Sequence, residues 1–167
     1  MSSDFIPVNT PLLMGNGKKY LIECIETGWI SSEGPFVKEF EKKFSQYIGR
    51  RYGIAVSSGT AALEISAKAV GLTGGDEVIV PTFTIISPVQ AVVKLGCVPV
   101  LIDSHSRTWN MDVSQIESKI TKKTKAIIAV HTYGLPVDLD PVSKLAEKYD
   151  LSVIEDAAEN MDKRIKK

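Results

Sequence analysis

The sequence predicts an α/β fold with a mostly parallel sheet that helices cover on both faces. Short apolar, β-branched runs alternate along the chain with longer segments whose apolar residues stand three and four positions apart, the spacing of amphipathic helices. The short runs are apolar at consecutive positions, which is typical of strands buried on both sides. Helical crossovers between successive strands favour parallel pairing.

Five runs are predicted to be strands, at residues 53–57, 77–81, 98–103, 126–131 and 152–156. Helices are expected between or before them, at residues 17–27, 36–48, 60–70, 84–95, 113–120 and 141–149. The first two helices flank a linker at 28–35 that is rich in glycine and serine and contains a tryptophan. This linker is either a surface turn or a loop that faces a ligand.

Local signals support two of the helix boundaries. Asp112 stands three residues before Gln115, which is the spacing of a capping box. Asp140 precedes Pro141, the pattern of an N-cap followed by proline at the first helical position. We therefore expect helices to begin at these two aspartates.

Composition indicates one globular core and argues against nucleic-acid or membrane partners. The 167 residues are 44% apolar and 24% charged, with 20 basic and 20 acidic side chains, which is ordinary for a single soluble domain. The formal net charge is zero and no basic stripe alternates with aromatic residues, so the sequence does not imply a nucleic-acid partner. The most apolar segment, 91–102, contains Lys94 and is shorter than the roughly 20 residues that span a bilayer.

The cysteines and the N-terminus indicate a cytoplasmic protein. Residues 1–4 place no basic stretch ahead of an apolar segment, so no secretory signal is expected. Cys24 and Cys97 form no metal-type cluster, and two buried thiols in a reducing compartment explain them best. We expect neither a disulfide nor a bound metal.

The first predicted strand ends in a candidate phosphate site, since ligands of open α/β sheets bind beyond the carboxyl ends of the strands. The chain breaks at Ser58 and Gly59 and restarts as a helix at Thr60. Free backbone N–H groups at the positive end of a helix bind phosphate. Alternatively, Ser58 or Thr60 only caps its own helix.

Three other strand ends carry polar or aromatic residues that have both a functional and a structural explanation. Asp156 is either the partner of a cationic ring nitrogen or an exposed strand-end acid or a cap. His131 either contacts a cofactor or packs beneath a loop. The segment 81–84 either lines the mouth of a site or caps the following helix.

The order of these motifs resembles one family. Residues 55–63 read AVSSGTAAL, residues 80–84 read VPTFT, residues 131–136 read HTYGLP, and residues 153–159 read VIEDAAE. Together with Asp138 and Asp140, they resemble the pyridoxal-phosphate (PLP) sugar aminotransferases of the DegT/StrS type. Asp103 followed by TWNMD at 108–112 is similar to the perosamine synthetase branch. The resemblance runs from about residue 6 to residue 159.

The resemblance implies the large domain of a fold-type I aminotransferase, with PLP as cofactor and a homodimer as the assembly. The implied substrates are a nucleotide sugar and an amino-acid donor, with glutamate as the expected donor. A protonated cofactor ring is the better electron sink in this chemistry. By similarity, the cofactor-binding residues are Gly59, Thr60, Ala61, Ile85, Asp156 and Glu159.

Each of these residues takes its role from the matching position in the family. Gly59, Thr60 and Ala61 bind the cofactor phosphate, and Asp156 pairs with the pyridinium nitrogen. Glu159 lies near the ring hydroxyl. Ile85 replaces the aromatic ring that family members usually stack on the cofactor, which leaves dispersion contact in place of stacking. The residues that match the sugar-pocket loop are Trp29, Ser31 and Ser32.

No lysine of the chain has the sequence context of the lysine that forms the Schiff base with PLP in this family. Without that amine the reaction loses its proton-transferring base, so we predict no catalytic residue here and no activity for the chain alone. We expect residues 1–160 to be the N-terminal part of the large domain and residues 161–167 to be a charged tail.

Two alternatives stay open at this point. The chain could belong to the sugar-nucleotide 3-dehydratase branch of the family, in which histidine replaces the lysine. It could also be a non-catalytic fragment that binds phosphate ligands or only dimerises.

Overall fold

A computed structural model describes residues 5–7 and 10–160 of the chain. The chain divides into two compact units, an N-terminal unit of residues 1–55 and a sheet unit of residues 56–167. The signal-free N-terminus predicted at residues 1–4 and the charged tail predicted at 161–167 lie outside the described residues.

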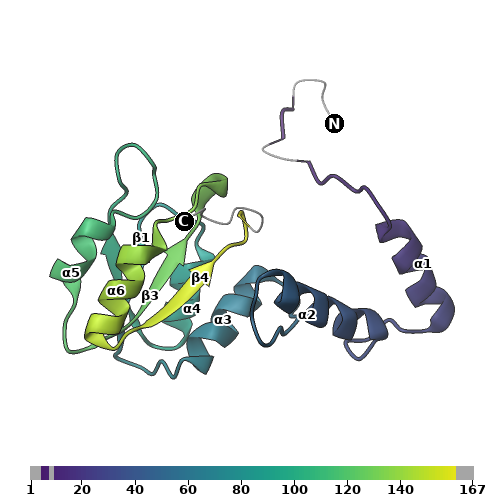
Figure 1. Cartoon of the computed structure of the whole chain (residues 1–167), viewed down its shortest axis with the longest axis horizontal. Helices are drawn as coiled ribbons and strands as arrows, with labels where there is room; N and C mark the ends of the chain where they lie inside the picture. Colours follow the sequence, from purple (N-terminus) through teal and green to yellow (C-terminus); the bar gives the residue numbers. More distant parts are fainter. Residues whose placement is uncertain (1–4, 8–9, 161–167) are drawn as a thin grey trace. The chain divides into compact units, whose positions relative to one another are not determined.

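The N-terminal unit contains two helices, both within one residue of their predicted boundaries (Figure 1). They are α1 (Gly17–Thr27) and α2 (Pro35–Tyr47). Helix α1 ends at Gly28, whose φ of 73° lies in the left-handed region that glycine adopts without strain. The rings of Tyr20 and Phe36 join the two helices, with their centroids 5.1 Å apart.

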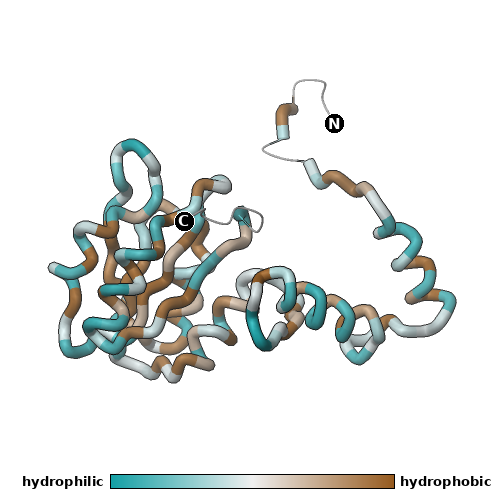
Figure 2. The backbone as a smooth tube through the Cα atoms, viewed as in Figure 1, coloured by the Kyte–Doolittle hydropathy of each residue, from teal (hydrophilic) through white to brown (hydrophobic). Residues whose placement is uncertain are grey.

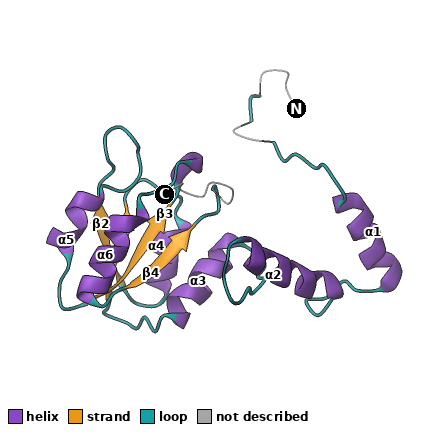
Figure 3. Cartoon of the chain, viewed as in Figure 1, coloured by secondary structure: helices purple, strands orange, loops and turns teal. Residues whose placement is uncertain are grey.

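The sheet unit contains a four-stranded sheet in the order β2-β1-β3-β4. All three strand pairs are parallel, so the predicted fold class is confirmed (Figure 3). The strands are β1 (Glu77–Pro81), β2 (Val98–Ile102), β3 (Thr124–Val130) and β4 (Ser152–Asp156). The helices are α3 (Gly59–Ala69), α4 (Ser87–Lys94), α5 (Ile116–Lys119) and α6 (Leu139–Tyr149), with short 3₁₀ turns at Val113–Gln115 and Thr132–Gly134.

The two central strands, β1 and β3, are buried on both faces, as their continuous apolar runs predict. The edge strands β2 and β4 are partly exposed, so the same prediction is wrong for them. Successive side chains of a strand point to opposite faces, so Val78 joins one core cluster and Ile79 the other. Helices α3 and α4 cover the first face, and α5 and α6 cover the second. Figure 2 shows hydrophobic residues along the strands of the sheet. In the described part of the chain, every buried apolar side chain belongs to the sheet unit.

The strand predicted at residues 53–57 is wrong. The chain there has no regular secondary structure, and the side chain of Ile54 is 75% exposed. A strand forms only where its N–H and C=O groups pair with a neighbour. The outer strands of the sheet are β2 and β4, and neither pairs with this segment.

The prediction of a helix start is confirmed at Asp112 and wrong at Asp140. Asp112 accepts the Ser114 N–H at 3.1 Å and the Gln115 side-chain amide at 2.9 Å, whereas a capping box would bring Gln115 to a backbone N–H. The Ser114 hydroxyl also donates to Asp112, at 2.6 Å. These bonds, above all the one from the Ser114 hydroxyl, lower the pKa of Asp112. Helix α6 starts earlier, because Asp138 caps it by accepting the Asp140 N–H at 3.2 Å.

Only one of the two cysteines is buried as predicted. Cys97 is buried, its thiol donates to the Thr73 carbonyl at 3.0 Å, and burial raises the pKa of this thiol. Cys24 is half-buried, and both cysteines are free thiols.

The described residues contain neither a helix that could span a membrane nor a cluster of metal-binding side chains. No helix in this part of the chain is long and apolar enough to cross a membrane. Nor do these residues contain a group of three or more His, Cys, Asp or Glu side chains that could hold a metal ion.

Shortening a buried side chain on one of the two central strands should lower the stability of the fold strongly. Ile127 on β3 is fully buried, and Ile→Ala at such a site costs about 2–5 kcal/mol because it leaves a cavity. Urea denaturation should therefore show a much lower unfolding midpoint for Ile127→Ala. Ile65→Ala removes the same atoms from a side chain that is 49% exposed and should cost clearly less. Equal losses in the two variants would contradict the assignment of Ile127 to the core.

Candidate functional site

The starts of two helices lie beside the carboxyl ends of the strands. Helix α4 follows β1 and packs back along the sheet, so its first residue, Ser87, is at the end of the sheet where β1 finishes. The Thr60 hydroxyl at the start of α3 lies 2.9 Å from the Ser87 hydroxyl. The predicted phosphate-binding segment therefore reaches the edge at which ligands of parallel sheets bind.

Ser58 is the residue that caps α3. Its hydroxyl accepts the Ala61 N–H at 3.2 Å, so the Thr60 hydroxyl is left for another partner. Among the described residues, no acceptor binds the N–H groups of Gly59 and Thr60, which belong to the first turn that every helix leaves unpaired. A Cβ atom at Gly59 would meet no heavy atom within 4 Å. The segment thus presents two free donors and open space at a positive helix end.

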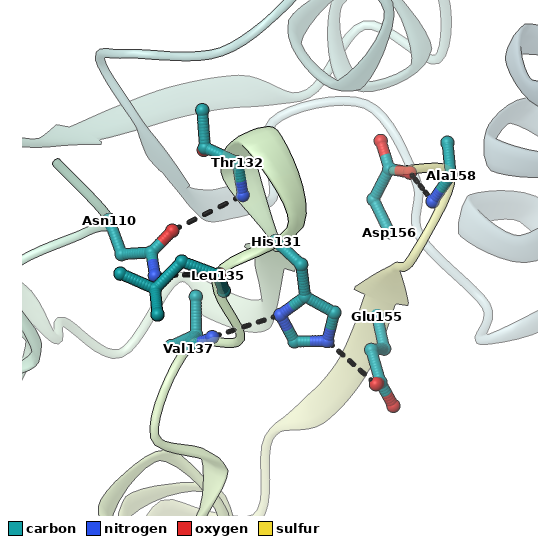
Figure 4. A network of polar contacts seen from close by, with 8 residues as sticks. All are labelled: Asn110, His131, Thr132, Leu135, Val137, Glu155, Asp156 and Ala158. Atoms are coloured by element: carbon teal, nitrogen blue, oxygen red, sulfur yellow. Dashed lines mark hydrogen bonds and ion pairs between the residues drawn. The ribbon is translucent and has the colours of Figure 1, made fainter. Parts of the chain in front are cut away.

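Asp156 ends β4 with a buried carboxylate, so the alternative of an exposed acid is wrong, whereas a capping role agrees with its contact to the following residues. One carboxylate oxygen accepts the Ala158 N–H at 3.2 Å (Figure 4). No Lys, Arg or His of the described residues forms an ion pair with Asp156. A buried carboxylate is costly without a cationic partner, and the arrangement therefore favours a cation at this position.

His131 has a structural role, which is the second of its two predicted explanations. Its ring is buried, and Nδ1 accepts the Val137 N–H at 3.0 Å. The ring proton is therefore on Nε2, which donates to the Glu155 carboxylate at 2.8 Å (Figure 4). With both nitrogens occupied, His131 fastens the loop at 131–137 to β4.

Asn110 holds the same loop from the other side, and sequence reasoning assigned it no role of its own. The buried amide donates to the Leu135 carbonyl at 2.9 Å and accepts the Thr132 N–H at 3.2 Å (Figure 4). The His131 N–H donates to the Asp156 carbonyl at 3.1 Å, which connects the loop to the end of β4. The only signal in the sequence is that an asparagine amide can satisfy an N–H and a C=O together.

The remaining residues predicted for the cofactor occupy the segments after β1 and β4. Glu159 accepts the Tyr133 N–H at 2.6 Å. Ile85 is 69% exposed, and it follows Thr84, whose hydroxyl oxygen is buried without a hydrogen-bond partner. These positions leave an apolar side chain and an unsatisfied hydroxyl beside the strand ends.

The residues predicted for the sugar pocket belong to the N-terminal unit. Trp29, Ser31 and Ser32 lie in the linker between α1 and α2, and all three are exposed. The Ser31 hydroxyl accepts the Glu33 N–H at 3.4 Å, so part of the linker is an ordinary hydrogen-bonded turn. The role of these residues in binding a sugar stays a prediction.

The segment 81–84 lines a hollow and does not cap α4, whose N-cap is Ile86. Phe83 contacts the rings of Trp109 and Tyr133, with centroids 5.4 and 6.2 Å apart. The hollow beside Phe83 has a volume of about 410 Å³ and also includes Asp103 and Trp109. Of the two predicted explanations for this segment, the structure supports the lining of a surface recess.

Comparisons with known proteins agree with this arrangement. Residues 13–166 match the DegT/DnrJ/EryC1/StrS aminotransferase family. The GDP-perosamine synthase of Escherichia coli O157:H7 is 46% identical over 162 residues, which are 97% of this chain and 44% of the relative. The GDP-perosamine synthase of Caulobacter vibrioides is 47% identical over 154 residues, which are 92% of this chain and 42% of the relative.

Solved structures give the same result. The chain is similar to NtdA of Bacillus subtilis with bound cofactor PMP, at 40% identity and a TM-score of 0.82, covering 86% of this chain and 33% of that one. An aminotransferase from Psychrobacter cryohalolentis matches at 33% identity and a TM-score of 0.83, covering 90% and 38%.

The matches cover nearly all of this chain but only part of each relative. The chain spans less than half the length of the relatives that it resembles. The family match covers nearly all of this chain, and the helix start and buried acid that the family motifs predict are present at the strand ends. The chain therefore belongs to the DegT/DnrJ/EryC1/StrS family of PLP-dependent aminotransferases.

Proposed function

We propose that the chain is the N-terminal part of a PLP-dependent sugar-nucleotide aminotransferase, which converts a keto-sugar nucleotide into the amino-sugar nucleotide with glutamate as donor. The observation that carries the proposal is a buried, cation-free carboxylate at Asp156 in a sheet unit whose α3 presents free N–H groups. The relatives named GDP-perosamine synthase support a nucleotide sugar as the substrate class.

The residues at the strand ends fit the two charged ends of PLP. Its phosphate is an anion, and Gly59, Thr60 and Ala61 form a helix start that favours anions by about 0.3–1 kcal/mol per charge, or up to about 2 when partly buried. Its ring nitrogen is cationic when protonated, and a charge-assisted hydrogen bond to Asp156 contributes about 1.5–3 kcal/mol. The unpartnered hydroxyl of Thr84 is a further polar group that a ligand could satisfy.

The proposed roles of the chain's own residues are to hold and orient the cofactor. PLP, when bound, supplies the electron sink for transamination. The negative charge of Asp156 keeps the ring nitrogen protonated, and Ile85 contributes apolar contact to the ring. Glu159, which the Tyr133 N–H orients, lies toward the ring hydroxyl, and the substrate-binding residues are Trp29, Ser31 and Ser32.

We further propose how the chain assembles, which residues form its domain and that it is inactive alone. Residues 1–160 would form part of the large domain of a homodimeric enzyme, followed by a charged tail at 161–167. Two free thiols suit a reducing compartment such as the cytoplasm. Without the Schiff-base lysine, the chain alone binds cofactor weakly and transfers no amino group.

Pyridoxamine phosphate, the amino form of the cofactor, tests the role of Asp156 directly. We expect the wild-type chain to bind it with millimolar affinity and Asp156→Asn to bind it about 10- to 100-fold more weakly, because the variant loses a charge-assisted bond. Isothermal titration or ligand fluorescence measures both affinities.

Asp150→Asn is the matched control for that experiment. Asp150 is an exposed aspartate at the end of α6 with a left-handed φ of 54°, a conformation that asparagine also tolerates. This variant removes the same charge and should bind like wild type. If both variants lost the same affinity for pyridoxamine phosphate, the effect would come from the net charge of the chain. That result would contradict the pairing of Asp156 with the ring nitrogen.

Chemical labelling tests the prediction that the chain alone is inactive. After incubation with PLP and reduction with borohydride, mass spectrometry should find substoichiometric label spread over several lysines, because no lysine is activated in a site. Amino transfer from glutamate should be undetectable. One dominant labelled lysine together with amino transfer would overturn the prediction.

A further inference from the structure

We infer that Ser87 is a positioning residue for the cofactor phosphate, because its hydroxyl turns the hydrogen of the Thr60 hydroxyl toward the anion. The inference rests on the proposed function and adds a residue to it. It comes from one long-range contact at the site, the 2.9 Å distance between Thr60 Oγ1 and Ser87 Oγ.

The two hydroxyls come from different helices. Thr60 is in the first turn of α3, and Ser87 is the first residue of α4. Both side chains are half-buried, so their geometry is set by the packing of α3 against α4 in the same core cluster. The contact is therefore built into the fold and does not depend on a mobile surface side chain.

The pair has one hydrogen bond and two hydrogens. Each hydroxyl carries one hydrogen and two acceptor lone pairs, and either oxygen can be the donor at 2.9 Å. Ser58 already caps α3, and no second hydrogen-bond partner of Thr60 Oγ1 or Ser87 Oγ occurs among the described residues. Within the pair, nothing in this part of the chain decides which hydroxyl donates.

A bound phosphate would determine which of the two hydroxyls donates. The dianion accepts hydrogen bonds and offers no donor, so it draws the Thr60 hydrogen toward itself. Thr60 Oγ1 can then only accept within the pair, and Ser87 must donate to it. Because a donated bond polarises the receiving hydroxyl, the Thr60 O–H becomes a better donor to the anion.

The start of α4 has one N–H group fewer than an ordinary helix start. Its second residue is Pro88, which lacks an N–H. The hydroxyl of Ser87 is the polar side chain of this helix start that lies against Thr60. Ser87 therefore acts on the anion through the hydroxyl pair.

The test compares a ligand with a phosphate and the same ligand without it. Pyridoxamine phosphate and pyridoxamine are titrated, by amide NMR shifts, into the wild-type chain, Ser87→Ala, Ser87→Thr and Ser66→Ala. We expect Ser87→Ala to weaken pyridoxamine phosphate binding about 2- to 10-fold, as for one neutral hydrogen bond. Pyridoxamine binding should stay unchanged, which a general structural defect would not allow.

Two further variants restrict the effect to the pair. Ser87→Thr keeps the hydroxyl and should bind both ligands like wild type, and Ser66→Ala makes the same change on α3 away from Thr60 and should do so too. Thr60→Val removes the hydroxyl at nearly constant shape. If Ser87 acts through Thr60, the double variant Thr60→Val/Ser87→Ala should bind pyridoxamine phosphate no more weakly than Thr60→Val alone.

The outcomes separate this inference from the proposed function. Wild type that binds pyridoxamine phosphate, with Ser87→Ala binding equally well, overturns the inference alone. Equal weakening of both ligands by Ser87→Ala, or additive losses in the double variant, also overturns it. Wild type that fails to bind pyridoxamine phosphate contradicts the proposed function, and with it any role for Ser87 toward a phosphate.

Discussion

Burial of the two central strands, β1 and β3, on both faces is the constraint on which the rest of the sheet unit depends. Each strand must be followed by a helix that crosses back over one face, because parallel neighbours cannot be joined by a tight turn. Ile79 and Ile127 face the cluster beneath α5 and α6, while Val78 and Ile128 face α3 and α4. The same crossovers bring strand ends and helix starts to one edge.

Two groups at this edge of the sheet favour ligand charges of opposite sign. The start of α3 favours an anion because its first N–H groups are unpaired and its dipole is positive there. The buried carboxylate of Asp156 favours a cation. A zwitterionic ring compound with a phosphate at one end and a protonated nitrogen at the other meets both preferences, which is the physical basis for the proposed cofactor site.

A satisfied polar network holds the loop beside this edge. Each polar side-chain atom of Asn110 and His131 has a hydrogen-bond partner on the loop at 131–137 or on Glu155. Buried networks of this kind make a loop rigid when all members are paired. The loop in turn orients Glu159 through the N–H of Tyr133. Stability and site geometry are therefore coupled through the same hydrogen bonds.

Sequence patterns predicted what local chemistry determines and missed what depends on distant partners. The runs that became β1 and β4 were predicted at their observed bounds, because short runs of consecutive apolar residues are typical of strands in a parallel sheet. The run at 53–57 is also short and apolar but has no pairing strand. Its exposure could not be predicted from the run itself.

At the candidate site, too, local features were predicted and contacts between distant residues were missed. The predictions of a helix start at Thr60 and an acid at Asp156 required only strand ends and turn residues. The pairing of Thr60 with Ser87 links residues 27 positions apart, and Asn110 bonds a loop 25 residues away. The N-cap of α6 is Asp138 and not Asp140, because the Asp138 side chain accepts the Asp140 N–H. Both aspartates precede Pro141, so spacing alone does not decide between them.

The central claim is that the two preferences at the sheet edge belong to one cofactor site, and amide-resolved NMR tests it most directly. Titration of the ¹⁵N-labelled chain with pyridoxamine phosphate should shift the amides of Gly59, Thr60 and Ala61 and those following Asp156 with a single dissociation constant. Inorganic phosphate should shift only the first group. Shifts at the two segments with different dissociation constants, or shifts confined to other parts of the chain, would contradict the account.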